Sequence, residues 1–135
     1  MNNRRDFMKT SLVASAGLMA AVTSSSACPN TPKNIFAYSK DNQGRWQGKA
    51  GSHAPVVTSK DGKVTLETKH GMAPAHYIVK HSIITEEGEV LGENVFFPSD
   101  KKAISSYEIK GKHAKLYALS FCNLHDLWVS EFSVG

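Results

Sequence analysis

In the last two thirds of the chain, hydrophobic and polar positions alternate with a period of two, as in β-strands that bury one face. Residues 63–68 are the clearest case, with Val64 and Leu66 on one side. Further runs rich in β-branched and aromatic residues occupy 76–84, 89–97, 106–109, 115–121 and 127–132. Turn-forming pairs such as Asp61-Gly62 separate them. Because no stretch here keeps a 3.6-residue apolar period for three turns, the pattern predicts an all-β sandwich or barrel.

The N-terminal segment has a different pattern. Arg4 and Arg5 open it, a mostly apolar run follows at 11–22, and small residues precede Cys28. A charged start, a short apolar run and a small-residue cleavage site are typical of a secretory signal, and the adjacent arginines resemble a twin-arginine export signal. The apolar run is shorter than the ~20 residues that span a bilayer. We therefore predict an export signal at residues 1–27 and a periplasmic protein, with a lipid anchor at Cys28 as a second interpretation.

The remaining chain divides into a short arm and one domain. Residues 28–45 contain several Pro, Asn and Gly with few apolar residues, which is typical of a linker or an irregular N-terminal arm. Residues 46–135 are long enough for one domain only. The net charge of +4 comes without a basic stripe and interleaved aromatics, so we predict no nucleic-acid partner. Two cysteines do not make a disulfide framework.

Five residues could bind a metal together. His53, His70, His76 and His125 lie where the pattern predicts strand ends or loops, and Cys122 precedes the last of them in Cys-Asn-Leu-His. A thiolate with several imidazoles suits iron, copper or zinc and disfavours magnesium or calcium. Taken singly, each residue also fits an ordinary surface or buried position, so the interpretation depends on the whole set.

Three motifs containing these residues occur in a fixed order. They are Ser-His-Ala-Pro around His53, His-Gly-Met-Ala-Pro-Ala-His-Tyr-Ile from His70, and Cys-Asn-Leu-His-Asp-Leu-Trp from Cys122. Together they resemble the superoxide reductases, the neelaredoxin family that also forms the iron-centre domain of desulfoferrodoxins. The resemblance runs over residues 46–135 and implies an immunoglobulin-like β-sandwich of about seven strands.

The resemblance also implies a cofactor, a reaction and partners. The cofactor would be one mononuclear non-haem iron that cycles between Fe2+ and Fe3+. Its four equatorial ligands would be His53, His70, His76 and His125, and its axial ligand would be Cys122. The iron would reduce superoxide by one electron to hydrogen peroxide, a defence against oxidative stress. An external electron donor, such as a rubredoxin or a small cytochrome, would then restore the iron. The sequence leaves open whether the chain forms a homo-oligomer. His81 and His113 match no ligand motif.

The sequence departs from the family pattern beside the ligands. Many members carry Glu-Lys just before the first histidine, and that lysine is thought to attract superoxide. Here Ser52 precedes His53, and the nearest lysine is Lys49. We therefore name Lys49 as the candidate for attracting the anionic substrate. Asp126 follows the last histidine, where glycine is usual, and aspartate tolerates a left-handed backbone better than most residues.

Two other classes of protein share part of this pattern. A blue-copper-like electron-transfer protein is also a sandwich with an early histidine and a late Cys-x-x-His. Such a site usually adds an axial methionine downstream, and no methionine follows Met72. A non-catalytic β-sandwich module of the sulfur-carrier type would not need this set of histidines. An optical spectrum separates the superoxide reductase, the blue-copper protein and the non-catalytic module. The first would show a ferric–thiolate band, the second an intense copper–thiolate band, and the third no such band.

Overall fold

A computed structural model describes residues 37–135, so the predicted signal at 1–27 lies outside the described residues. The elements in chain order are η1 (Gly44–Trp46), α1 (Ala50–His53), β1 (Val56–Lys60), β2 (Lys63–Thr68), β3 (Ile78–Thr85), β4 (Val90–Val95), β5 (Ala103–Glu108), β6 (His113–Cys122) and β7 (Asp126–Val134). Within this part of the chain, no helix is long and apolar enough to cross a membrane.

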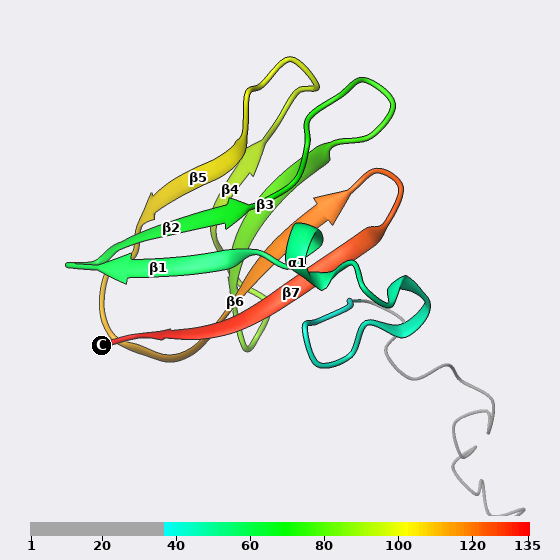
Figure 1. Cartoon of the computed structure of the whole chain (residues 1–135). Helices are drawn as coiled ribbons and strands as arrows, with labels where there is room; N and C mark the ends of the chain where they lie inside the picture. The colour runs from blue at the N-terminus through cyan, green and yellow to red at the C-terminus, as the bar shows by residue number, and fades with distance from the viewer. Residues whose placement is uncertain (1–36) are drawn as a thin grey trace, which may run out of the picture. The chain divides into compact units, whose positions relative to one another are not determined.

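The strands form two antiparallel sheets that face each other (Figure 1). One sheet has the order β1-β2-β5, and the other has the order β4-β3-β6-β7. The chain changes sheet between β2 and β3, between β4 and β5, and between β5 and β6, which is the connectivity of a Greek-key sandwich. The predicted all-β sandwich is therefore confirmed, and the order of its strands is that of an immunoglobulin-like fold.

The alternating pattern explains how the core forms. In β2 every second side chain is buried, and Val64 and Leu66 are fully buried between the sheets. They pack in one cluster with Ile83 of β3, together with apolar residues of β6. The turn before β2 has positive φ at both Asp61 and Gly62, as a two-residue type I′ hairpin requires. The Asp-Gly pair thereby sets the register that turns the apolar face of β2 inward.

A second, smaller cluster lies at the end of the sandwich where β6 stops. Ile78, Phe96, Ala103 and Cys122 are buried in it, and Met72 packs against them. One predicted metal ligand is therefore part of the packed core and not of a surface loop. Burial there limits the movement of the thiol and keeps water from that side of the site.

Some predicted boundaries shift in the structure. β1 begins at Val56, directly after the first histidine motif, and most of its side chains are exposed. His76 does not open β3, because it lies in a turn closed by an antiparallel bridge to Ala73. In the arm, Tyr38 forms a parallel bridge with Trp128 of β7. This part of the arm is therefore attached to the domain by backbone hydrogen bonds.

Candidate metal centre

His53 is the last residue of α1, and hydrogen bonds to the ring nitrogen that faces away from the other histidines orient its imidazole. Its Nδ1 lies 3.1 Å from the backbone oxygen of Lys49 and 2.8 Å from the hydroxyl of Ser52. Because a carbonyl oxygen can only accept a hydrogen bond, the contact with Lys49 favours the proton on Nδ1. The lone pair of Nε2 is then free for a metal, in the way that outer partners orient metal-binding histidines.

His70 follows the end of β2 and is held in a similar way. Its backbone N–H donates to the oxygen of Thr68 at 2.7 Å, which turns the chain sharply after the strand. Its Nδ1 contacts the backbone oxygen of Gly71, and this oxygen too can only accept. His70 therefore also presents Nε2 to the centre.

Asn123 holds together the two loops that carry His76 and His125. Its amide nitrogen donates to the oxygen of Ala75 at 3.1 Å, and its Oδ1 accepts from the N–H of Tyr77 at 3.0 Å. These two bonds bracket His76, while Asn123 itself lies in the turn between β6 and β7, two residues before His125. The loop before β3 and the loop after β6 therefore carry their histidines as one hydrogen-bonded unit.

The four imidazoles form a closed ring in the order His53, His70, His76 and His125. Neighbouring ring centroids are 4.3–4.7 Å apart, whereas those of the opposite pair His53 and His76 are 5.8 Å apart. Three neighbouring pairs of ring nitrogens are 2.9–3.0 Å apart. Two nitrogens bound at right angles to one ion, each at ~2.1 Å, would lie about 3.0 Å from each other. These three pairs of nitrogens therefore have the spacing of ligands that lie at right angles around one ion.

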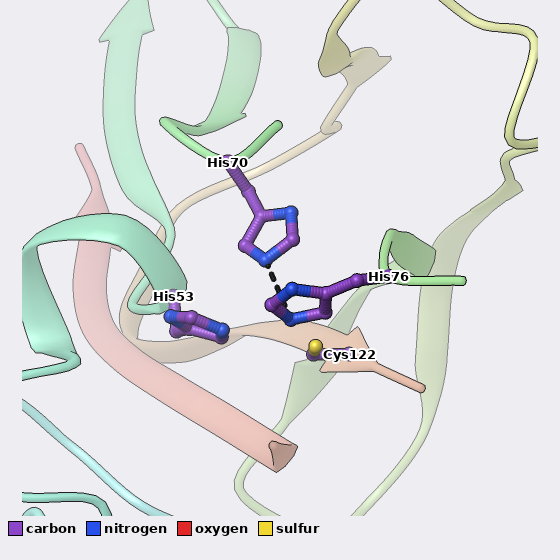
Figure 2. A group of neighbouring side chains, drawn as sticks. All are labelled: His53, His70, His76 and Cys122. Carbon is purple, nitrogen blue, oxygen red and sulfur yellow. Dashed lines mark hydrogen bonds between the residues drawn. The ribbon is translucent and has the colours of Figure 1, made fainter. Parts of the chain in front are cut away.

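Cys122, the last residue of β6, adds a buried thiol to this ring. Its Sγ and the nitrogens of His53, His70 and His76 all lie within 4.8 Å of one another (Figure 2). The Sγ is also 3.8 Å from Nδ1 of His125. His125 presents Nδ1 to its neighbours, whereas the other three histidines present Nε2. The structure thus places all five predicted residues around one point.

The two other histidines lie away from this group. His81 is fully buried between the sheets, where it contacts the hydroxyls of Thr68 and Ser105 at 2.8 Å each. His113 is the first residue of β6, at the opposite end of the strand from Cys122. Its Nε2 lies 3.0 Å from the backbone oxygen of Lys110. Neither residue matches a ligand motif in the sequence, and the structure places both outside the group around Cys122.

The electrostatics of the ring suit metal binding. Burial first, and then the neighbouring imidazole of His70, lower the pKa of His53 to about 4. Burial also lowers the pKa of His70 and of His125. These three imidazoles are therefore neutral at pH 7, which is the form that binds a metal. Neutral imidazoles with a thiol fit iron, copper or zinc, so the donor set agrees with the implied iron.

Lys49 lies beside the centre with an exposed side chain. Its ammonium group is near enough to lower the pKa of both His70 and His125. These two histidines come from different loops, so the charge of Lys49 acts on more than one member of the ring. The predicted charged residue is therefore close to the centre, although it precedes the first ligand by four positions.

A group of residues around His125 was not predicted. The ring of Trp46 packs edge-to-face on His125 with centroids 4.6 Å apart, and Trp128 Nε1 donates to the backbone oxygen of His125 at 2.8 Å. The indole Nε1 of Trp46 donates to Asp126, whose carboxylate also accepts from Arg45. Asp126 has φ of 61°, the left-handed conformation. The signal that could have found this group was the aspartate at a position where glycine is usual.

The fold and the donor set define the class as a β-sandwich with a candidate mononuclear metal centre built from histidines and one cysteine. The sequence pattern of the family described as Desulfoferrodoxin matches residues 43–131. The chain therefore belongs to the desulfoferrodoxin family, as its motifs predicted.

Related proteins agree with this assignment. A superoxide reductase of Pyrococcus abyssi is 33% identical over 106 residues, which cover 65% of this chain and 90% of that protein. The solved superoxide reductase (neelaredoxin) of Ignicoccus hospitalis has the same fold, with a TM-score of 0.63 and 23% identity over 77% of this chain and 98% of that one. A superoxide reductase in the oxidised state is 26% identical, with a TM-score of 0.51, over 68% of this chain and 94% of that one.

Proposed function

We propose that this chain is a superoxide reductase, which reduces superoxide by one electron to hydrogen peroxide at one mononuclear non-haem iron. The observation that carries the proposal is the closed ring of four imidazoles beside a buried thiol, in a chain of the desulfoferrodoxin family. Relatives with the same fold bear the name superoxide reductase, which supports the choice of reaction.

The proposed ligand set has four nitrogen atoms and one sulfur atom. It consists of Nε2 of His53, His70 and His76, Nδ1 of His125, and Sγ of Cys122. When bound, the iron supplies one electron to superoxide, which takes up two protons and leaves as hydrogen peroxide. The chain's own contribution is to hold neutral imidazoles in place before metal binds, with the outer nitrogens of His53 and His70 fixed by backbone carbonyls.

Cys122 contributes from the buried side of the centre. A thiolate ligand raises the electron density on its metal, as a cysteine does for haem iron. The thiol is 1% exposed and packs in a cluster with Ile78, Phe96 and Ala103, so water does not reach it from the core. We propose that substrate approaches from the other side, where His70 and His76 are half-buried.

We propose that Lys49 attracts superoxide to that open side. Superoxide is an anion, and positive charge near a site raises the rate of encounter with an anionic substrate. The support is electrostatic: the charge of Lys49 is felt by both His70 and His125. The backbone oxygen of the same residue orients His53, so the loop before α1 would serve the site in two ways.

The geometry favours iron over a blue-copper site. A blue-copper site binds through two histidines and one cysteine in a trigonal arrangement, with a weak axial methionine. Here four imidazoles close a ring, and a two-histidine site would leave two of them without a role. Met72 packs in the apolar cluster beside Ile78 and Phe96, which gives it a structural role.

The proposed reaction needs a source for its electron. A rubredoxin-like centre needs four cysteines, and these 135 residues contain two. We propose an external one-electron donor, such as a rubredoxin or a small cytochrome. The donor can be identified by mixing the oxidised protein with reduced candidates and following the loss of the ferric–thiolate band.

One measurement tests the reaction itself. Iron-loaded protein that has been reduced beforehand is mixed with a known amount of superoxide, and hydrogen peroxide and dioxygen are both measured. A reductase yields one hydrogen peroxide for each superoxide consumed and no dioxygen, with one iron oxidised each time. Release of dioxygen, as in dismutation, would contradict the proposal. Full occupancy by zinc or copper after cytoplasmic loading would contradict the choice of metal.

We propose in addition that residues 1–27 direct export to the periplasm. The support is the sequence of this segment alone, which places two arginines before a short apolar run. Changing Arg4 and Arg5 to lysine together should leave the full-length chain in the cytoplasm. Export that continues unchanged in this variant would contradict a twin-arginine route.

A further inference from the structure

Four buried polar side chains form a continuous hydrogen-bonded chain across the core. His81 Nδ1 lies 2.8 Å from Ser105 Oγ, and His81 Nε2 lies 2.8 Å from Thr68 Oγ1. The Thr68 hydroxyl in turn donates to Ser120 Oγ at 2.8 Å. Thr68 and Ser105 belong to the three-stranded sheet, whereas His81 and Ser120 belong to the four-stranded sheet. The chain of bonds therefore joins the two layers of the sandwich.

The direction of each bond can be assigned. Since the Thr68 hydroxyl donates to Ser120, its oxygen accepts from His81, which must carry its proton on Nε2. Nδ1 of His81 is then an acceptor, and the Ser105 hydroxyl donates to it. Every described buried side-chain nitrogen and oxygen has a partner. A neutral His81 therefore fits between its neighbours in one tautomer only.

Such a bridge is more directional than apolar packing. A core tolerates the substitution of one apolar side chain by another and small shifts in their positions. A buried polar network, in contrast, destabilises the fold when one member moves and leaves its partners without a hydrogen bond. His81 is 0% exposed and its ring packs edge-to-face on Phe96 with centroids 4.8 Å apart, so it has little freedom to re-form the bonds elsewhere.

The bridge ends next to two members of the metal centre. The backbone N–H of His70 donates to the oxygen of Thr68, whose side chain is in the bridge. Ser120 lies two residues before Cys122 on the same strand, so both side chains face the core. His70 and Cys122 come from opposite sheets. Their separation therefore depends on how the ends of β2 and β6 are held together.

We propose that His81 is a positioning residue for the metal centre. By joining Thr68, Ser105 and Ser120 across the core, it fixes the distance between the ends of β2 and β6, and so between His70 and Cys122. The inference rests on the proposed function only in taking these two residues as metal ligands.

The first test uses metal-free protein. In full-length chains with Cys28→Ser, the only remaining thiol is that of Cys122, and its rate of alkylation reports how well the end of β6 is held. His81→Leu removes the bridge, and Thr68→Val removes the shared hydroxyl with little change of shape. Under conditions in which each variant is fully folded by circular dichroism, both should raise the rate about tenfold, which corresponds to about 1.4 kcal/mol less free energy needed to expose the thiol.

Matched variants separate positioning from general stability. His81→Gln keeps a donor and an acceptor, and Thr68→Ser keeps the hydroxyl, so both should restore most of the protection. Ile83→Ala opens a cavity in the same strand but in the other core cluster, which does not contain Cys122, so it should lower the melting temperature without exposing Cys122. If Ile83→Ala accelerated alkylation as much as His81→Leu, the bridge would act through stability alone and the inference would be wrong.

The second test uses the iron-loaded protein and a chelator. His81→Leu and Thr68→Val should each release iron about tenfold faster than the parent chain, and the double variant little faster than either, because both break one network. Wild-type release rates in both variants would overturn the inference while leaving the proposed function intact. A parent chain that takes up no iron would overturn the proposed function, whereas the alkylation test would still decide the role of His81.

Discussion

Trp46 and Asp126 are 80 residues apart in the sequence, and the indole Nε1 of Trp46 donates to the Asp126 carboxylate at 2.9 Å. This bond holds the indole ring edge-to-face against His125. It also explains the role of Asp126, which directly follows His125 and has a left-handed backbone conformation. The pair therefore orients a proposed ligand from the side exposed to solvent.

Replacing Asp126 separates the hydrogen bond from the charge. Asp126→Asn keeps an acceptor for Trp46 and tolerates the left-handed backbone, so the visible spectrum of the iron-loaded protein should change little. Asp126→Gly relieves the backbone but releases the indole, so it should shift the ferric–thiolate band and the tryptophan fluorescence together. Equal spectra for the glycine variant and the parent chain would show that Trp46 does not orient His125.

Asn123 provides a test of how the two histidine loops are coupled. Asn123→Ala removes both side-chain bonds that bracket His76, and we expect iron release about tenfold faster, as for other outer partners of ligands. Asn123→Asp retains the acceptor for Tyr77 but loses the donor to Ala75, so it should lie between the alanine variant and the parent. An aspartate variant that releases iron as fast as the alanine variant would assign the effect to the amide nitrogen alone.

The buried His81 predicts how stability depends on pH. Burial lowers the pKa of His81 to about 4 from an ordinary 6.5. Between these values the unfolded chain binds a proton that the folded chain does not. The free energy of unfolding should therefore fall as pH decreases from 6.5 to 4, by about 3 kcal/mol for this residue, and then level off. Urea unfolding of metal-free protein across this range measures it.

The control for this prediction is His81→Gln, which does not titrate. The difference in unfolding free energy between the parent and this variant removes the contributions of the other histidines. That difference should shift in favour of the variant as the pH falls. A constant difference across the range would mean that His81 keeps an ordinary pKa in the fold.

Salt dependence tests the attraction of superoxide by Lys49. Exposed charges are screened within ~10 Å at 0.1 M salt, so a guiding charge makes the bimolecular rate fall with ionic strength. Lys49→Ala should slow superoxide capture at low salt and flatten that dependence, and Ser52→Lys should then add little to the parent rate. Pulse radiolysis across a salt series measures both variants. A silent Lys49→Ala with a faster Ser52→Lys would show that no charge guides the substrate in the parent chain.

The sequence predicted those parts of the fold that depend on local alternation. The predicted strand at 63–68 coincides with β2 because Val64 and Leu66 alternate with polar residues and are both fully buried. The bounds of β1 were not predicted, because it lies at the edge of its sheet with mostly exposed side chains and so has no alternating pattern. The helix α1 has four residues, too few for a helical period.

The candidate site was predicted through motifs, and its surroundings were not. The three motifs identify five candidate ligands because each candidate lies next to a turn or strand end within its own motif. The contacts of Trp46 with Asp126, and of Thr68 with His81, join segments that carry no shared sequence signal. The alternation of apolar and polar residues would also misplace Thr68 and Ser120. Polar residues in a strand are expected to face solvent, whereas these two are buried in the core.

The closed ring of imidazoles also has a consequence for the order of folding events. His53 and His125 touch through ring nitrogens although 72 residues separate them in the chain, and the two other rings come from loops between them. Contacts of such long range form late, after the local hairpins, because closing a long loop costs entropy before it gains any contact. Strand signals should therefore appear earlier in refolding than the colour of the metal centre. Uptake of metal thus reports that the last strands have docked.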